Sequence, residues 1–397
     1  MSKIIATDLQ LTNMSGYHAV EPAIDPQNKP TFLLDWELTL KCNLDCSYCK
    51  SDLYGGHWNS SSHPPLSECL QTIDFMMQYV DMYMDHKPKW SKAVVLNVYG
   101  GESLYHPNID TILYQVHLKH QNYKNSWPLT VSCTSNLIVK QNLLEKVEPY
   151  INEWTASYHC EAKSKQKETF KNNVKYLVDK GNSVKVIVLM HSDQSYWPEL
   201  LEIIEWCKIN DIHCLPRALD GNRVSNYNQD QIEWFNNLYV SKTPNTAKTE
   251  QIENLKNTAQ TEKPFSAVGR ACCGGRKICT NENYKKNIFF IPDNNFTGWS
   301  CSVNWFFLYI KQYTKEIFVN KDCKMNFNNE VGPIGYLDNY QDLINQTKIN
   351  LDQQTMPVIT CKKDKCLCGL CAPKALTYDK FNDIMKKHTR HNVFDTK

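Results

Sequence analysis

Three cysteines lie close together near the start of the chain, Cys42, Cys46 and Cys49 in the run CNLDCSYC. Thiolates are soft ligands that bind iron and zinc. An iron–sulfur cube has four iron corners, so a loop that supplies three thiolates leaves one corner open to a small molecule. The same spacing also fits a zinc knuckle that a distant fourth Cys or His completes. The neighbouring residues must therefore distinguish an open catalytic cluster from a closed structural site.

Two predicted strands each lead into a motif that could bind a metal or a ligand. The run FLLDWELTL at 32–40 alternates as strands do and enters the cysteine loop. The apolar run at 93–99 leads directly into Gly100, Gly101 and Glu102. Glycines lack a Cβ and let backbone carbonyls approach a ligand, and an adjacent carboxylate complements an ammonium group. An ordinary strand-to-helix turn would explain the glycines alone, but their place at a strand end after the cysteine loop favours a ligand site.

With Tyr48 before the last cysteine, this order of motifs resembles the radical S-adenosylmethionine (SAM) superfamily. Its members have a Cys-x3-Cys-x2-Cys loop after the first strand, with an aromatic residue before the last Cys, and Gly-Gly-Glu after the second strand. The resemblance implies that Cys42, Cys46 and Cys49 hold a [4Fe-4S] cluster whose open iron is chelated by the amino and carboxylate groups of SAM. An electron from the cluster then breaks a C–S bond, and the resulting 5′-deoxyadenosyl radical abstracts a substrate hydrogen atom.

The resemblance also implies which residues contact SAM. The run CTSNL is similar to the family's ribose-contacting motif, with Leu137 in place of a glycine. Ser157 ends the predicted fourth strand, where many relatives place a serine near the SAM carboxylate or ribose. A helix cap or a turn is an equal alternative for each of the weaker candidates Ser135, Asn136 and Ser157. The full set of implied SAM contacts is Tyr48, Gly100, Gly101, Glu102, Ser135, Asn136 and Ser157.

Strands and helices alternate after the second strand. Further strands are predicted at 130–133, 153–158, 184–190 and 213–218, and helices at 142–150, 165–180 and 197–210. Six strands interleaved with helices indicate an α/β fold in which a parallel sheet curls into a partial (β/α)6 TIM-like barrel. Ligand sites of such barrels lie at the C-terminal ends of the strands, which is where the motifs above are predicted to lie.

The C-terminal third is rich in cysteine, with nine of the 17 Cys after residue 270. In a reducing compartment such enrichment indicates metal ligation. The run at 299–323 is predicted to form a hairpin flanked by Cys301 and Cys323, and a Cys-x2-Cys pair follows. This order resembles the SPASM and twitch extensions of radical SAM enzymes, which hold auxiliary iron–sulfur clusters. It implies auxiliary ligands at Cys301, Cys323, Cys368 and Cys371. The remaining Cys272, Cys273, Cys279, Cys361 and Cys366 are left for a second cluster, for a zinc, or for ligands that displace one of these four.

The composition favours a cytoplasmic enzyme. The first residues lack the apolar region of a signal peptide, no stretch approaches a membrane span, and the cysteine count is odd. A net charge of +2 indicates no surface for nucleic acid. We expect an N-terminal extension (1–30), the barrel (31–220), a polar linker or helical insertion with an amphipathic patch at 231–239 (221–262), and a cysteine-rich auxiliary-cluster domain (263–397).

The resemblance implies an enzyme that cleaves SAM, with peptide or protein side-chain modification as the expected reaction. About thirty residues precede the first strand, too few for a leader-binding domain, so a separate leader-binding partner would be required. The same chemistry on a small molecule, such as a sugar, amino acid or nucleotide, is the first alternative. A zinc-binding scaffold without catalysis is the alternative of another class. An enzyme of this kind needs an electron donor such as a flavodoxin or ferredoxin.

Overall fold

A computed structural model describes residues 2–5, 17–21, 32–49, 62–86, 93–219, 227–240, 296–321, 323–362 and 374–388. Its main feature is a sheet of six parallel strands in chain order, each hydrogen-bonded to the next. These strands are β3 (Phe32–Thr39), β4 (Val94–Gly100), β5 (Leu129–Ser135), β6 (Glu153–Tyr158), β7 (Ser183–Met190) and β8 (His213–Ala218).

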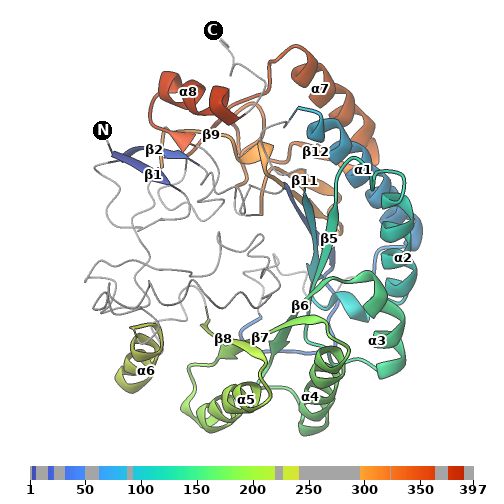
Figure 1. Cartoon of the computed structure of the whole chain (residues 1–397), viewed down its shortest axis with the longest axis vertical. Coiled ribbons are helices and arrows are strands. Elements are labelled where there is room, and N and C mark those ends of the chain that lie inside the picture. Colours follow the sequence, from blue (N-terminus) through green and yellow to red (C-terminus); the bar gives the residue numbers. More distant parts are fainter. Residues whose placement is uncertain are drawn as a thin grey trace, which may run out of the picture.

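A helix follows each of these strands, and Figure 1 shows the first five along the outer side of the curved sheet. The six helices are α1 (Leu66–Met84), α2 (Ile109–His120), α3 (Gln141–Val147), α4 (Ser164–Asp179), α5 (Trp197–Ile209) and α6 (Gln229–Val240). The predicted partial (β/α)6 barrel is therefore confirmed. The helix predicted at 142–150 ends earlier, at Val147, and continues as a 3₁₀ turn, Glu148–Tyr150. Pro149 lies in that turn, and a proline has no N–H for an α-helical hydrogen bond.

The two faces of the sheet differ because side chains alternate along a strand. On β3, Phe32, Leu34, Trp36 and Leu38 are at most 1% exposed and join the main core with the helices. The residues between them point to the opposite, concave face. There the parallel register pairs Asp35 with Asn97, and the Asn97 amide donates to the Asp35 carboxylate at 3.0 Å. The barrel therefore has an apolar outer layer under the helices and polar groups on its inner face.

Three strands from the C-terminal third extend the same sheet. The hairpin of β10 (Phe307–Lys311) and β11 (Glu316–Phe318) confirms the one predicted at 299–323, and β10 pairs with β3 in parallel. β12 (Gly335–Tyr336) adds the last strand, and α7 (Tyr340–Asp352) packs on α1. The Trp36 indole also donates to Gln312 at 2.9 Å in the buried interior. The strand that leads into the cysteine loop is thus paired on both sides.

A second, five-stranded sheet brings the two ends of the chain together (Figure 1). Its order is β1 (Ser2–Ile5), β2 (Tyr17–Glu21), β14 (Lys374–Ala375), β9 (Ser300–Cys301) and β13 (Ile359–Thr360), with α8 (Tyr378–His388) after β14. The domain limits expected from the sequence stay a prediction.

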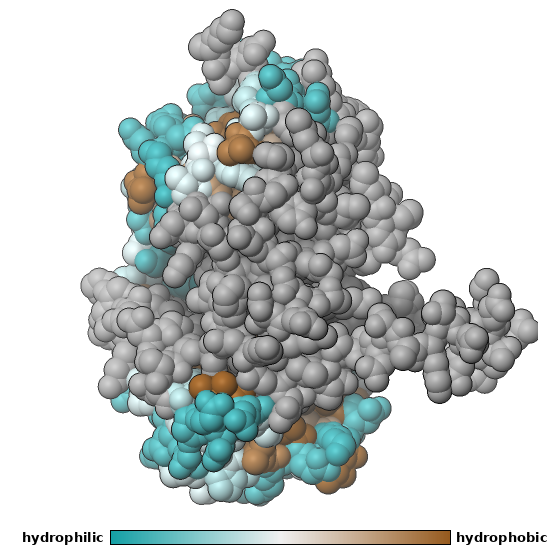
Figure 2. Space-filling model, turned by 90° about the vertical axis from the view of Figure 1, so that its left-hand side faces the viewer, coloured by the Kyte–Doolittle hydropathy of each residue, from teal (hydrophilic) through white to brown (hydrophobic). Residues whose placement is uncertain are grey.

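The described part of the surface is mainly hydrophilic on the side seen in Figure 2, with separate hydrophobic patches. Exposed large apolar side chains such as Ile209 and Val331 are scattered over different elements, as is common on protein surfaces. Within the described ranges, no helix is both long and apolar enough to cross a membrane.

Candidate metal centre at the cysteine loop

The cysteine loop starts where the ends of β3 and β4 touch. The Gly101 N–H donates to the Thr39 carbonyl and the Glu102 N–H to the Lys41 carbonyl, both at 2.7 Å. A Cβ on Gly100 would collide with the Thr39 carbonyl oxygen, and a Cβ on Gly101 would lie 2.5 Å from two loop carbonyl oxygens. Real Cβ atoms do not approach backbone so closely. The predicted glycine pair is therefore required by the loop itself, which passes directly over it.

Glu102, which follows β4, forms hydrogen bonds with residues at the end of β5. Its carboxylate is 1% exposed and accepts hydrogen bonds from Ser135 Oγ at 2.7 Å, the Asn136 N–H at 2.6 Å and the Leu104 N–H at 3.0 Å. Burial raises the pKa of Glu102 to about 7, while these three hydrogen bonds favour the charged form. The structure thus brings together three of the residues expected to contact SAM, Glu102, Ser135 and Asn136, and shows that they hold one another.

The first half of the loop, which contains Cys42 and Asn43, is held by Asn136. Its side-chain amide donates to Asn43 Oδ1 at 2.7 Å and lies 3.9 Å from Cys42 Sγ. The Asn43 amide in turn donates to the Ile138 carbonyl at 2.8 Å. Leu137, where the sequence resemblance expects a glycine, takes a left-handed φ of 52° with its side chain fully buried. Leu137 thus holds a backbone conformation that glycine adopts more readily.

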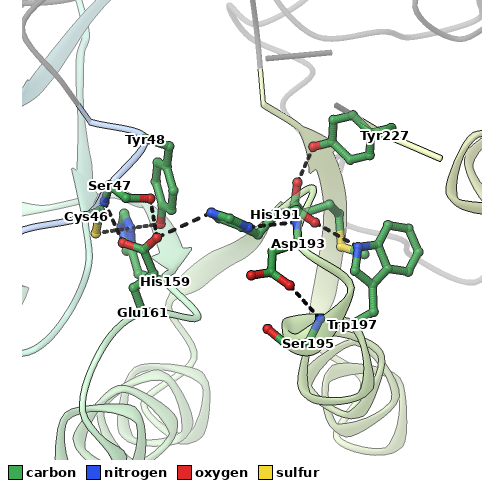
Figure 3. Close-up of polar contacts among 11 residues, drawn as sticks. Cys46, Ser47, Tyr48, His159, Glu161, His191, Asp193, Ser195, Trp197 and Tyr227 are labelled. Atoms are coloured by element: carbon green, nitrogen blue, oxygen red, sulfur yellow. Dashed lines mark hydrogen bonds and ion pairs between the residues drawn. The ribbon is translucent and has the colours of Figure 1, made fainter. Parts of the chain in front are cut away.

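The second half of the loop, from Cys46 to Cys49, is held by residues that follow β6 and β7 (Figure 3). The Ser47 N–H donates to Glu161 Oε2 at 2.5 Å, and the Ser47 hydroxyl donates to Glu161 Oε1. His191 Nε2 lies 3.3 Å from Glu161 Oε1. The Asp193 N–H donates to His191 Nδ1 at 3.0 Å, so the ring proton is on Nε2 and points to the carboxylate. Glu161 thus links the loop to two strand ends.

His159, after β6, faces Cys46 and Tyr48. Its Nδ1 is 2.7 Å from the Tyr48 hydroxyl and 3.4 Å from Cys46 Sγ, and the Tyr48 and His159 rings stack with their planes 6° apart. Burial lowers the pKa of His159 to about 4, so the ring is neutral near pH 7. The Tyr48 hydroxyl and His159 Nδ1 share a hydrogen bond, and the tautomer of the ring sets which of them donates. The aromatic residue predicted from the motif therefore packs against a histidine that the motif does not include.

The three thiols form a donor set that suits soft iron. Burial raises the pKa of both Cys42 and Cys46 to about 12, so each keeps its proton near neutral pH until a metal ion displaces it. The Leu44 N–H points at Cys42 Sγ at 3.4 Å, a kind of contact that stabilises cluster thiolates. Among the described residues no three His, Cys, Asp or Glu side chains converge on a single ion. Thiolates of a cube bind separate irons and need no such convergence, so the donor set fits a cluster.

The remaining predicted ligands lie elsewhere or outside the described residues. Ser157 lies on the concave face of β6 beside Ile187. Cys301, Cys323 and Cys361 are buried, and the Cys361 N–H donates to the Trp299 carbonyl at 2.9 Å, beside the strand that carries Cys301. The predictions for Cys272, Cys273, Cys279, Cys366, Cys368 and Cys371 fall outside the described ranges.

Three residues of the site, His159, Glu161 and His191, were not predicted from the sequence. Each follows a correctly predicted strand, β6 or β7, at the edge where barrels carry their ligand sites. Polar residues directly after predicted strands were therefore the signal that could have identified them.

No family model and no curated protein matches the chain. Similar solved structures include hexahistidine-tagged anSMEcpe with bound AdoMet, with 14% identity, a TM-score of 0.38, and coverage of 53% of this chain and 60% of that chain. Native anSMEcpe with bound AdoMet and Cp18Cys peptide has 13% identity, a TM-score of 0.36, and coverage of 53% and 60%. Native anSMEcpe with bound AdoMet has 13% identity, a TM-score of 0.37, and coverage of 53% and 62%. The chain spans less than two thirds of the length of these proteins.

Proposed function

We propose that this chain is a radical SAM enzyme. The observation that carries the proposal is the place of the three-cysteine loop at the C-terminal edge of a partial (β/α)6 barrel. Residues after β4, β5 and β6 form hydrogen bonds with the loop, and His191, after β7, contacts Glu161 beside it. A closed structural site needs no such placement, whereas barrel enzymes carry their active sites at this edge. Cys42, Cys46 and Cys49 would hold a [4Fe-4S] cluster, and SAM bound beside it would supply a 5′-deoxyadenosyl radical that takes a hydrogen atom from the substrate.

The residues around the loop fix its backbone for this role. Asn136 and Glu161 hold the two halves of the loop from β5 and β6, and Glu102 ties Asn136 to β4. A loop held in this way loses little conformational freedom when it binds its cluster, so less binding energy goes into ordering it. Tyr48, Gly100, Gly101, Glu102, Ser135, Asn136 and Ser157 stay the proposed SAM contacts.

The proposed reaction is modification of a peptide or protein side chain, and the same chemistry on a small molecule is the alternative. The polar inner face of the barrel, with Asp35, Glu37 and Asn97, supports a substrate that carries hydrogen-bonding groups. Both substrate classes meet that condition. An auxiliary cluster on Cys301, Cys323, Cys368 and Cys371, and an electron donor such as a flavodoxin or ferredoxin, belong to the same proposal.

One observation favours a second candidate, a non-catalytic zinc site. His159 Nδ1 lies 3.4 Å from Cys46 Sγ, a separation that two ligands of one tetrahedral zinc ion can have. His159 would then be the fourth ligand and would have to leave the Tyr48 hydroxyl, which is closer to the same nitrogen.

Anaerobic purification and reconstitution with iron and sulfide test the proposal. The loaded chain should be brown and should form 5′-deoxyadenosine from SAM under strong reduction. Changing Cys42, Cys46 and Cys49 together to Ala should abolish 5′-deoxyadenosine and remove about one cluster while auxiliary iron remains. Cys214→Ala, a thiol on β8, is the matched control and should keep both.

Two results would refute the proposal. One is a colourless protein that contains zinc but no sulfide and loses its zinc in His159→Ala, because this is what the scaffold requires. The other is a fully loaded cluster that cleaves no SAM under strong reduction.

A further inference from the structure

Ser47 lies between the second and third cysteines of the loop, and both of its donors go to one carboxylate. Its backbone N–H and its hydroxyl bind the two oxygens of Glu161 (Figure 3). The Cys49 N–H donates to the Cys46 carbonyl at 3.0 Å, so these residues form a tight turn around Ser47. Holding Ser47 therefore holds the positions of Cys46 and Cys49 together.

Glu161 is itself fixed from the opposite side. His191 Nε2 lies 3.3 Å from its Oε1, and the side chains of both residues are about one-sixth exposed, at 15% and 16%. The His191 ring also packs edge-on against Tyr196 at a centroid distance of 5.0 Å. The carboxylate therefore has a defined place and does not simply follow the loop.

Cys42 is held independently, by the Leu44 N–H and through Asn43 and Asn136. These contacts do not involve Glu161. A change at Glu161 should therefore affect the second half of the loop and spare the first, which provides an internal control within one loop.

We infer that Glu161 is a positioning residue for the metal centre. It keeps Cys46 and Cys49 in place before metal binds, and it sets a negative charge beside the thiolates. A carboxylate near a cluster disfavours the added electron, because reduction makes the cluster more negative. Glu161 should therefore lower the reduction potential of the loop-bound cluster. This electronic effect rests on the proposed function, whereas the positioning effect does not.

The positioning effect is tested on the metal-free full-length chain by the rate at which iodoacetamide labels each loop cysteine, located by tandem mass spectrometry. Glu161→Gln keeps the size of the side chain but replaces one acceptor with an amide donor. It should speed labelling of Cys46 about tenfold, the change expected for the loss of one charge-assisted hydrogen bond, and should also speed labelling of Cys49. The rate at Cys42 should stay unchanged.

Ser47→Ala removes one of the two contacts and should act in the same direction by a smaller factor. Glu202→Gln, which breaks an exposed ion pair with Lys171 on the barrel surface, is the matched control and should change none of the three rates. Equal rates at Cys46 in Glu161→Gln and wild type would overturn the inference. An equal acceleration at all three cysteines would overturn it as well, because it would indicate general unfolding.

The electronic effect is tested by the midpoint potential of the reconstituted cluster, followed by electron paramagnetic resonance. Glu161→Gln should hold the same iron per chain and show a higher potential than the wild type. An unchanged potential at full loading would overturn this part. A chain that binds no cluster at all would refute the proposed function instead, while the labelling result would still stand by itself.

Discussion

Gly101→Ala is expected to unfold the chain more easily because the cysteine loop leaves no room for a methyl group. The new Cβ would lie 2.5 Å from the carbonyl oxygens of both Leu40 and Lys41. Both are backbone atoms, so neither can rotate away as a flexible side chain could. The ends of β3 and β4 must separate instead.

The magnitude follows from three contributions. Overpacking costs about 1–3 kcal/mol, and separation of the strand ends weakens two backbone hydrogen bonds worth about 1 kcal/mol each. The lower entropy of the unfolded chain with alanine returns about 0.4–1 kcal/mol. The net loss is about 2–5 kcal/mol in the free energy of unfolding.

Urea denaturation of the metal-free chain, followed by tryptophan fluorescence, measures this loss. Gly332→Ala is the matched control, because its Cβ would find only the Asn326 side chain at an ordinary contact distance of 3.7 Å. Gly101→Ala should denature at clearly lower urea and Gly332→Ala near the wild-type midpoint. Equal midpoints for all three chains would refute the close approach of the strand ends.

Two further predictions concern the residues around the loop. Burial raises the pKa of Glu102 to about 7 from its ordinary value of 4.5. Between these pH values the folded chain holds a proton on Glu102 that the unfolded chain has lost, so Glu102 lowers stability as pH rises from 5 to 7, by about 3 kcal/mol at most. His159, whose pKa burial lowers to about 4, contributes with the opposite sign over the same range. Stability should therefore rise more steeply from pH 5 to pH 7 in Glu102→Gln than in the wild type, measured as denaturant midpoints at both pH values; equal slopes in the two chains would argue against a titrating Glu102. Leu137→Gly removes the backbone strain of a leucine in the left-handed region, which favours the variant by about 1–2 kcal/mol. It also deletes a fully buried side chain, and the Leu→Ala part of that loss alone costs about 2–5 kcal/mol. The variant should therefore be less stable than the wild type by the same denaturation assay, and a more stable variant would contradict this balance.

Local patterns predicted the barrel well because they depend on neighbours in the sequence. The strands at 153–158 and 213–218 have the predicted bounds, and the helix at 165–180 is shifted by one residue at each end. Alternation of apolar residues and a glycine after a helix are signals that a short window contains.

The contacts that define the site depend on residues far apart in the sequence. Ser47 and Glu161 are separated by 114 positions and Trp36 and Gln312 by 276. No short-range pattern in a sequence indicates which distant residues will pair. The motif therefore identified the three cysteines but not the side chains that hold them. The glycine pair was predicted as a ligand-binding feature, and its packing role against the loop became clear only from the register of β3 and β4.

The pairing of β3 with β10 has a consequence for biosynthesis. Leu34 lies opposite Leu308, so on the ribosome the strand that leads into the cysteine loop has one unpaired edge until the hairpin near residue 310 has emerged. At about 5–20 residues per second, that interval is on the order of half a minute. Iron delivered to the nascent chain would meet thiols on a sheet that is still incomplete, so assembly of the proposed cluster is expected to follow the emergence of this hairpin.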